Sequence, residues 1–197
     1  MAEIKFRYEF RIWAETLAPL RKRLEGLAHA KQTVSQETYL VSARTDRCNA
    51  KIRSDLMDIK VLIAEDRGLE QWKPVLKAGF PLQRSVIASH VFASLELPPP
   101  VLSRTEYARG EFLGEVIASE PQIAIVHVSK NRYQFSLETC QAEFAAVTLN
   151  HLGRDTVAVE SADPDAVLQL IRDLGVAGEA NTSYIREIKR VLSLVAV

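Results

Sequence analysis

The chain has 197 residues, of which 47% are hydrophobic and 25% are charged, and its 25 basic side chains balance its 25 acidic ones. This composition excludes a disordered or low-complexity chain and suits one domain with a buried core. A net charge of zero also argues against a general binder of nucleic acids or anionic membranes, which would carry a basic excess.

Cysteine usage and the N-terminal segment predict the location of the protein. Cys48 and Cys140 belong to no Cys-x-x-Cys pair, so neither a disulfide framework nor a zinc ribbon is expected. Residues 1–13 lack the apolar core of a signal peptide, and the longest uncharged stretch, residues 85–95, is shorter than the ~20 residues that span a bilayer. We therefore expect a cytoplasmic protein with no membrane partner.

The first part of the chain begins with the most informative strand pattern. Residues 4–13 alternate strictly between apolar and polar side chains, which predicts a strand with one face toward the core. Its polar face carries Arg7, Glu9 and Arg11. A helix is predicted over about residues 16–30, with a threonine as its N-cap. Three further strand patterns cover residues 37–43, 50–54 and 57–65.

Prolines divide the middle of the chain. Pro74 and the segment 79–81 interrupt the next stretch, where no element is predicted. A helix is predicted over residues 87–95 because apolar side chains recur there every four positions. The three prolines at 98–100 end this helix and are the best candidate for an internal boundary.

The last part of the chain returns to strand patterns between helices. Ser103 and Glu106 have the spacing of a capping box, which predicts a helix that continues through Ile117. Asp163 is typical of a helix start and Gly175 of a helix end. The other elements are strand patterns over residues 123–138, 141–149 and 156–161 and a final helix over about residues 183–194. The predicted fold class is α+β, with seven or eight mostly antiparallel strands and about five helices.

Charged side chains recur at alternate positions of the predicted strands. The positions are Arg7, Glu9, Arg11, Lys51, Arg53, Lys60, Lys130, Arg132, Glu138, Glu143 and Glu160. Each strand could simply have a solvated face. If the sheet closes into a barrel with helices packed outside, however, these side chains converge on one cavity. Arginines and lysines there would bind a polyanion, and glutamates beside them would be oxygen ligands for Mg²⁺ or Mn²⁺.

A series of short motifs, in their order along the chain, resembles the CYTH superfamily of triphosphate tunnel metalloenzymes. They are Tyr39-Leu40, Lys51-Ile52-Arg53, Ile59-Lys60, Lys130-x-Arg132, Glu143-Phe144-Ala145, Val159-Glu160 and the closing segment Asn181 to Tyr184. The resemblance implies one tunnel domain over residues 1–197, built as an eight-stranded, closed or nearly closed β-barrel. It also implies metal-dependent hydrolysis of inorganic or organic triphosphates.

The resemblance assigns a role to individual residues. The catalytic and metal-binding positions that it implies are Glu9, Glu143 and Glu160, with Mg²⁺ or Mn²⁺ as the cofactor. The phosphate-binding positions that it implies are Arg7, Arg11, Lys51, Arg53, Lys60, Arg84, Lys130 and Arg132. The partner would be a triphosphate-containing small molecule or a polyphosphate, with no nucleic acid expected.

Two departures from the family pattern leave alternatives open. The family signature Glu-x-Glu-x-Lys reads Arg7, Glu9 and Arg11 here, and the expected Arg-x-Glu reads Arg84-Ser85-Val86. Lost carboxylates should weaken metal affinity more than anion affinity. The alternatives are a non-catalytic or nearly inactive module that binds polyphosphates or nucleotides, a member that cyclises ATP, and an ordinary interaction domain with solvated strand faces.

Overall fold

The computed structural model describes residues 6–193, and its long strands form a closed sheet. They are hydrogen-bonded in the order β1-β10-β9-β8-β2-β3-β4-β5, and β5 pairs back with β1. The bounds are β1 (Tyr8–Ala14), β2 (Ala30–Ser42), β3 (Cys48–Arg53), β4 (Leu56–Asp66), β5 (Leu69–Gly79), β8 (Ile123–Ser136), β9 (Gln141–Leu149) and β10 (Leu152–Ser161). A separate small sheet pairs β6 (Leu82–Gln83) with β7 (Glu106–Tyr107). The predicted α+β class with an eight-stranded antiparallel barrel is confirmed.

Contacts between Cα atoms divide the chain into two compact units, which we describe separately. Within the described residues, unit 1 contains residues 6–35, 62–73 and 129–183, and unit 2 contains residues 36–61, 74–128 and 184–193. The prolines at 98–100 lie inside unit 2 and mark no boundary between the units. The single domain over residues 1–197 stays a prediction.

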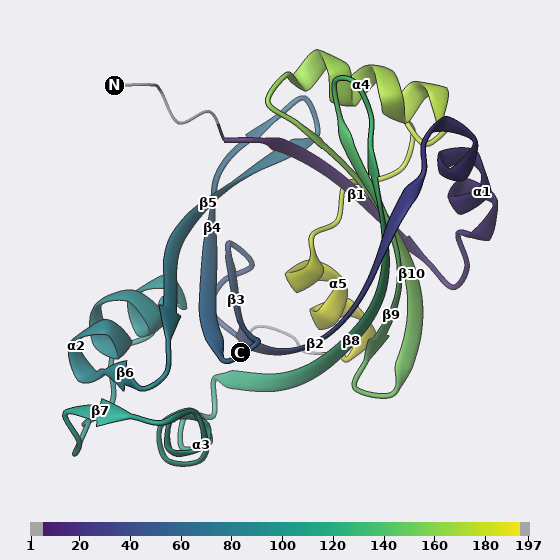
Figure 1. The fold of residues 1–197 in the computed structure, drawn as a ribbon. Coiled ribbons are helices and arrows are strands. Elements are labelled where there is room, and N and C mark those ends of the chain that lie inside the picture. Colours follow the sequence, from purple (N-terminus) through teal and green to yellow (C-terminus); the bar gives the residue numbers. More distant parts are fainter. Residues whose placement is uncertain (1–5, 194–197) are drawn as a thin grey trace. The chain divides into compact units, whose positions relative to one another are not determined.

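In unit 1, two helices cover the apolar face of β1, β9 and β10. Helix α1 (Ala18–Leu27) contacts β9, and α4 (Pro164–Asp173) contacts β10 and β1, as Figure 1 shows. Phe10 and Ile12 are buried in this core, so Glu9 and Arg11, which alternate with them along β1, lie on its other face. The predicted cap of α4 is confirmed, because the carboxylate of Asp163 accepts the second helical N–H at 3.0 Å.

In unit 2, short helices cover the apolar face of β2, β3 and β4. These helices are α2 (Arg84–Val86), its π-helical continuation η1 (Ile87–Phe92), α3 (Arg109–Glu111) and its π-helical continuation η2 (Phe112–Ile117). Their buried side chains pack in one cluster with Leu40, Ile52 and Ile59. Figure 1 shows α2 and α3 beside the β6–β7 pair.

Helix α5 (Tyr184–Val191) contacts a different face of unit 2. It contacts β3, and its Tyr184 ring stacks on Tyr39 at a centroid distance of 5.7 Å. Tyr39 alternates with Leu40 along β2, so α5 lies on the strand face opposite the one that η1 and η2 cover. The predicted helix extended to residue 194, which lies outside the described residues.

The capping box predicted at Ser103 and Glu106 is wrong. Glu106 lies in strand β7, and the helix begins three residues later, where the Glu111 carboxylate accepts the N–H of Ala108 at 2.8 Å. Glu111 is therefore the capping glutamate of this helix. It comes later in the chain than predicted because Glu106 and Tyr107 pair with β6 and do not enter the helix.

Strand β5 was not predicted from the sequence, and it contains Pro74. Among residues 6–193, the register joins β5 to β1 at Glu70 and Gln71. The start of the predicted first strand, residues 4 and 5, lies outside the described residues. In the part of the chain that the structure describes, no helix is long and apolar enough to cross a membrane.

Candidate functional site

The guanidinium of Arg11 is the centre of the charged face of unit 1. Its Nε donates to Glu9 Oε1 at 2.9 Å, and its Nη1 lies 3.5 Å from Glu143 Oε1. Arg11 is opposite Ala158 in β10, which is in turn opposite Glu143 in β9. The small alanine side chain leaves room for the two charged groups to meet across it. The Thr156 hydroxyl accepts a further bond from Arg11 at 3.3 Å, so the guanidinium is held on three sides.

Glu143 is enclosed by positive charge. Arg132 donates to it through Nε at 2.8 Å and also through Nη2. Burial by itself would raise the pKa of the Glu143 carboxyl, but neighbouring positive charges outweigh burial and hold its pKa below the ordinary value. These charges belong to Arg11, Arg132 and the buried Lys130. Glu143 is therefore ionised at neutral pH and acts as their shared counter-ion.

Three glutamates lie in a row across neighbouring strands of unit 1. Glu160 in β10 and Glu70 in β5 are both directly opposite Glu9 in β1. Like charges in such positions repel each other. Each carboxylate has its own donor: Arg11 for Glu9, Arg7 for Glu160 at 2.8 Å, and the Trp72 indole for Glu70 at 3.0 Å. The buried Glu70 was not among the predicted site residues, because β5 was not predicted.

A second charged group lies on β2, β3 and β4 in unit 2. Lys51 and Arg53 alternate along β3, with Asp58 of β4 opposite Lys51 and Glu37 of β2 opposite Arg53. The ion pairs are long: Glu37 lies 3.5 Å from Lys51 Nζ and 3.6 Å from Arg53 Nη1, and Asp58 lies 3.6 Å from Arg53 Nη2. Charge-assisted hydrogen bonds are typically ~2.7–2.9 Å. These cations are thus held loosely, unlike Arg11 and Arg132.

Glu37, which is 3% exposed, was not among the predicted site residues. The alternation of the predicted strand already places Glu37 on the same face as Tyr39. The cations that Glu37 contacts, however, depend on the pairing of β2 with β3. Lys51 also lies over the Tyr39 ring at 5.6 Å. Burial lowers the pKa of Lys51, and the Glu37 carboxylate only partly opposes this effect.

The predicted site residues thus fall into two sets in the described chain. The set in unit 1, which we call the β1 network, is Arg7, Glu9, Arg11, Lys130, Arg132, Glu143 and Glu160. The set in unit 2, which we call the β3 cation group, is Lys51, Arg53 and Lys60. The convergence of both sets on one cavity stays a prediction.

Arg84 and Val86 lie in helix α2. The side chain of Arg84 is exposed, whereas Val86 packs against the apolar cluster of unit 2. A glutamate at position 86 would therefore enter an apolar cluster. The phosphate-binding role of Arg84 stays a prediction.

The arrangement of carboxylates does not fit a centre for Mg²⁺ or Mn²⁺. Over residues 6–193, no group of three or more His, Cys, Asp or Glu side chains is placed to hold a metal ion. Mg²⁺ needs oxygen ligands at ~2.0–2.1 Å around one point. Instead, each of Glu9, Glu143 and Glu160 is bonded to an arginine. Metal binding by these three residues stays a prediction.

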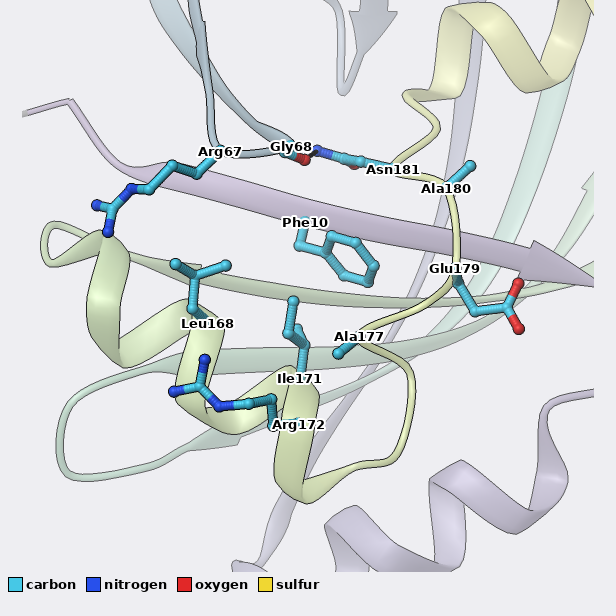
Figure 2. Close-up of a pocket in the computed structure, with 10 residues that line it drawn as sticks. All are labelled: Phe10, Arg67, Gly68, Leu168, Ile171, Arg172, Ala177, Glu179, Ala180 and Asn181. Atoms are coloured by element: carbon cyan, nitrogen blue, oxygen red, sulfur yellow. Dashed lines mark hydrogen bonds between the residues drawn. The ribbon is translucent and has the colours of Figure 1, made fainter.

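A pocket of about 410 Å³ lies on the apolar face of β1. Figure 2 shows Phe10 facing Ile171 and Ala177 across it, with Arg67 and Arg172 toward one end. Because Phe10 points away from the face that carries Glu9 and Arg11, this pocket is separate from the β1 network. Its apolar floor does not suit a phosphate chain.

The structure is a closed antiparallel barrel with charged side chains at alternate strand positions, which is the fold that the sequence resemblance implied. No family model matches the sequence, and no curated protein matches it.

Solved structures do match. PH1012 from Pyrococcus horikoshii OT3 is 14% identical, with a TM-score of 0.53 over 94% of this chain and 99% of that chain. PH1819 from the same organism is 11% identical, with a TM-score of 0.53 over the same shares. HpAC1 from Hippeastrum, described as having a dominant triphosphatase activity, is 12% identical, with a TM-score of 0.47 over 86% of this chain and 88% of that chain. At these identities the likeness shows the fold alone.

Proposed function

We propose that the protein binds compounds with a linear triphosphate or polyphosphate chain, and that the β3 cation group is the primary anion-binding element. The observation that carries this proposal is the loose pairing of Lys51 and Arg53, whose carboxylate partners lie at 3.5–3.6 Å. A phosphate oxygen offers both cations a shorter, charge-assisted bond than their present partners do.

The electrostatics of the group support an anionic ligand. Lys51, Arg53 and Lys60 bring three positive charges against the two negative charges of Glu37 and Asp58. Lys60 has the same parity as Asp58 in β4, so it lies on the same strand face. Because burial already lowers the pKa of Lys51, a phosphate beside it restores favourable interaction with its charged form. Several cations on adjacent strands suit several linked phosphoryl groups better than one.

Binding of tripolyphosphate tests this proposal. We expect Arg53→Ala to lose about 1–3 kcal/mol of tripolyphosphate affinity in calorimetric titrations with EDTA present. Orthophosphate should bind far more weakly than tripolyphosphate to the wild type. Arg104→Ala is the matched control, because Arg104 is another partly exposed arginine of unit 2 that pairs with glutamates. An affinity that neither Arg53→Ala nor Lys51→Met changes would contradict the proposal.

Metal-dependent hydrolysis of triphosphates is the second candidate. The observation that favours it is the direct opposition of Glu9 and Glu160, which brings two carboxylates to one strand face. Because arginines already bond to both, we expect phosphate release from tripolyphosphate with Mg²⁺ or Mn²⁺ to be low. Robust release that EDTA stops and Glu160→Gln abolishes would establish this candidate instead. Glu25→Gln, at an exposed ion pair, is the control.

The cytoplasmic location stays a prediction.

A further inference from the structure

Arg11 lies between Glu9 and Glu143, two carboxylates to which the sequence resemblance assigned a metal ion. We infer that the guanidinium of Arg11 replaces a divalent cation between Glu9 and Glu143, so that the β1 network is complete without a metal. This inference deepens the proposed function, since it makes phosphate binding independent of metal, but its geometry rests on the β1 network alone.

The contacts of Arg11 are those of a bridging cation. One edge of the guanidinium bonds to Glu9 Oε1 at 2.9 Å, and another lies 3.5 Å from Glu143 Oε1. A guanidinium is planar, always charged and able to donate to two carboxylates at once. The carboxylates belong to β1 and β9, which are separated by β10, so Arg11 joins oxygens from two different strands, as a metal ion would.

The fold fixes this bridge. The side chain of Arg11 is 9% exposed, and Thr156, which is fully buried, holds it from β10. Thr156 is itself anchored, because its hydroxyl donates to the carbonyl of Ile12 at 2.8 Å. An arginine held by a buried and hydrogen-bonded neighbour loses little further side-chain freedom when it bridges the two carboxylates.

A metal ion would have to displace this bridge. A divalent cation that approached Glu9 would meet Arg11 on the same strand face, and Coulomb repulsion between the two cations is strong where water is largely excluded. Glu160 offers no alternative, since Arg7 already bonds to it, and Glu143 is also bonded to Arg132. The carboxylates of the β1 network therefore act as internal counter-ions.

A titration with Mn²⁺ and no phosphate tests the inference separately from the proposed function, which tripolyphosphate tests. We expect the wild type to bind no stoichiometric Mn²⁺ by calorimetry in the range where weak protein sites bind, roughly 10⁻⁴–10⁻³ M. Arg11→Gln removes the bridging charge, and we expect it to gain one Mn²⁺ site at least about tenfold tighter than any binding by the wild type. The double variant Arg11→Gln with Glu143→Gln should lose that site.

Arg104→Gln is the matched control for this titration. Arg104 also joins two glutamates, Glu111 and Glu115, but on exposed helix positions. It should gain no comparable site, and an equal gain would overturn the inference. A wild type that binds one Mn²⁺ per chain, with binding lost in Glu143→Gln, would also overturn it. That measurement decides the question even if Arg11→Gln fails to fold.

Discussion

Glu143→Gln should lower the free energy of unfolding by about 3 kcal/mol at neutral pH, because it removes a buried carboxylate that neutralises neighbouring positive charges. Glu143 bonds to Arg132 and lies 3.5 Å from Arg11, and Lys130 adds a third charge nearby. A glutamine keeps the size of the side chain but offers only a neutral oxygen. Urea unfolding of both proteins measures the difference.

The same variant should bind tripolyphosphate about tenfold more tightly, since the positive charges that the carboxylate neutralised become available to an anionic ligand. Stability and affinity would then change in opposite directions. If Glu143 instead held a metal together with the ligand, its removal would lower both. Glu25→Gln, which removes the same charge from an exposed i,i+4 pair, should change either quantity by no more than about 0.5 kcal/mol. Lower affinity of Glu143→Gln in EDTA would contradict the counter-ion role.

The fold could be predicted from the sequence because its strands have one apolar and one charged face. In β1, the alternation of Phe10 and Ile12 with Glu9 and Arg11 fixes which residues face the core. Turn and cap residues such as Asp163 act locally, so the start of α4 was also predictable. Strand β5 was not, because Pro74 argues against a strand unless its position relative to the neighbouring strand is known.

The candidate site could be predicted only as a set of residue types. The alternation of side chains along each strand places Arg11 and Glu143 on charged faces. Their contact depends on the strand register, which sets Ala158 between them. Register is a long-range property, and nothing near Arg11 in sequence specifies it. Glu37 was missed for the same reason, whereas Glu70 was missed because strand β5 was not predicted. The sequence resemblance implied a metal centre at Glu9, Glu143 and Glu160. In the structure, an arginine bonds to each of these carboxylates.

Beside the β3 cation group, Glu37→Gln should lower the free energy of unfolding by about 3 kcal/mol, because Glu37 is the buried counter-ion of Lys51. Burial already lowers the pKa of Lys51, and loss of the opposing carboxylate should lower it further. Lys51→Met removes the charge that Glu37 neutralises. The double variant should therefore be less destabilised than the sum of the single variants.

A double-mutant cycle measures this coupling directly. We expect an interaction energy of about 2 kcal/mol between Glu37 and Lys51, which is within the range for residues in one buried network. The exposed pair of Arg104 and Glu115 is the control and should give a much smaller interaction energy, because water and salt screen it. Additive effects at Glu37 and Lys51 would mean that the 3.5 Å separation carries no net attraction. In that case Lys51 would be held by packing alone, and its availability to a phosphate would not depend on Glu37.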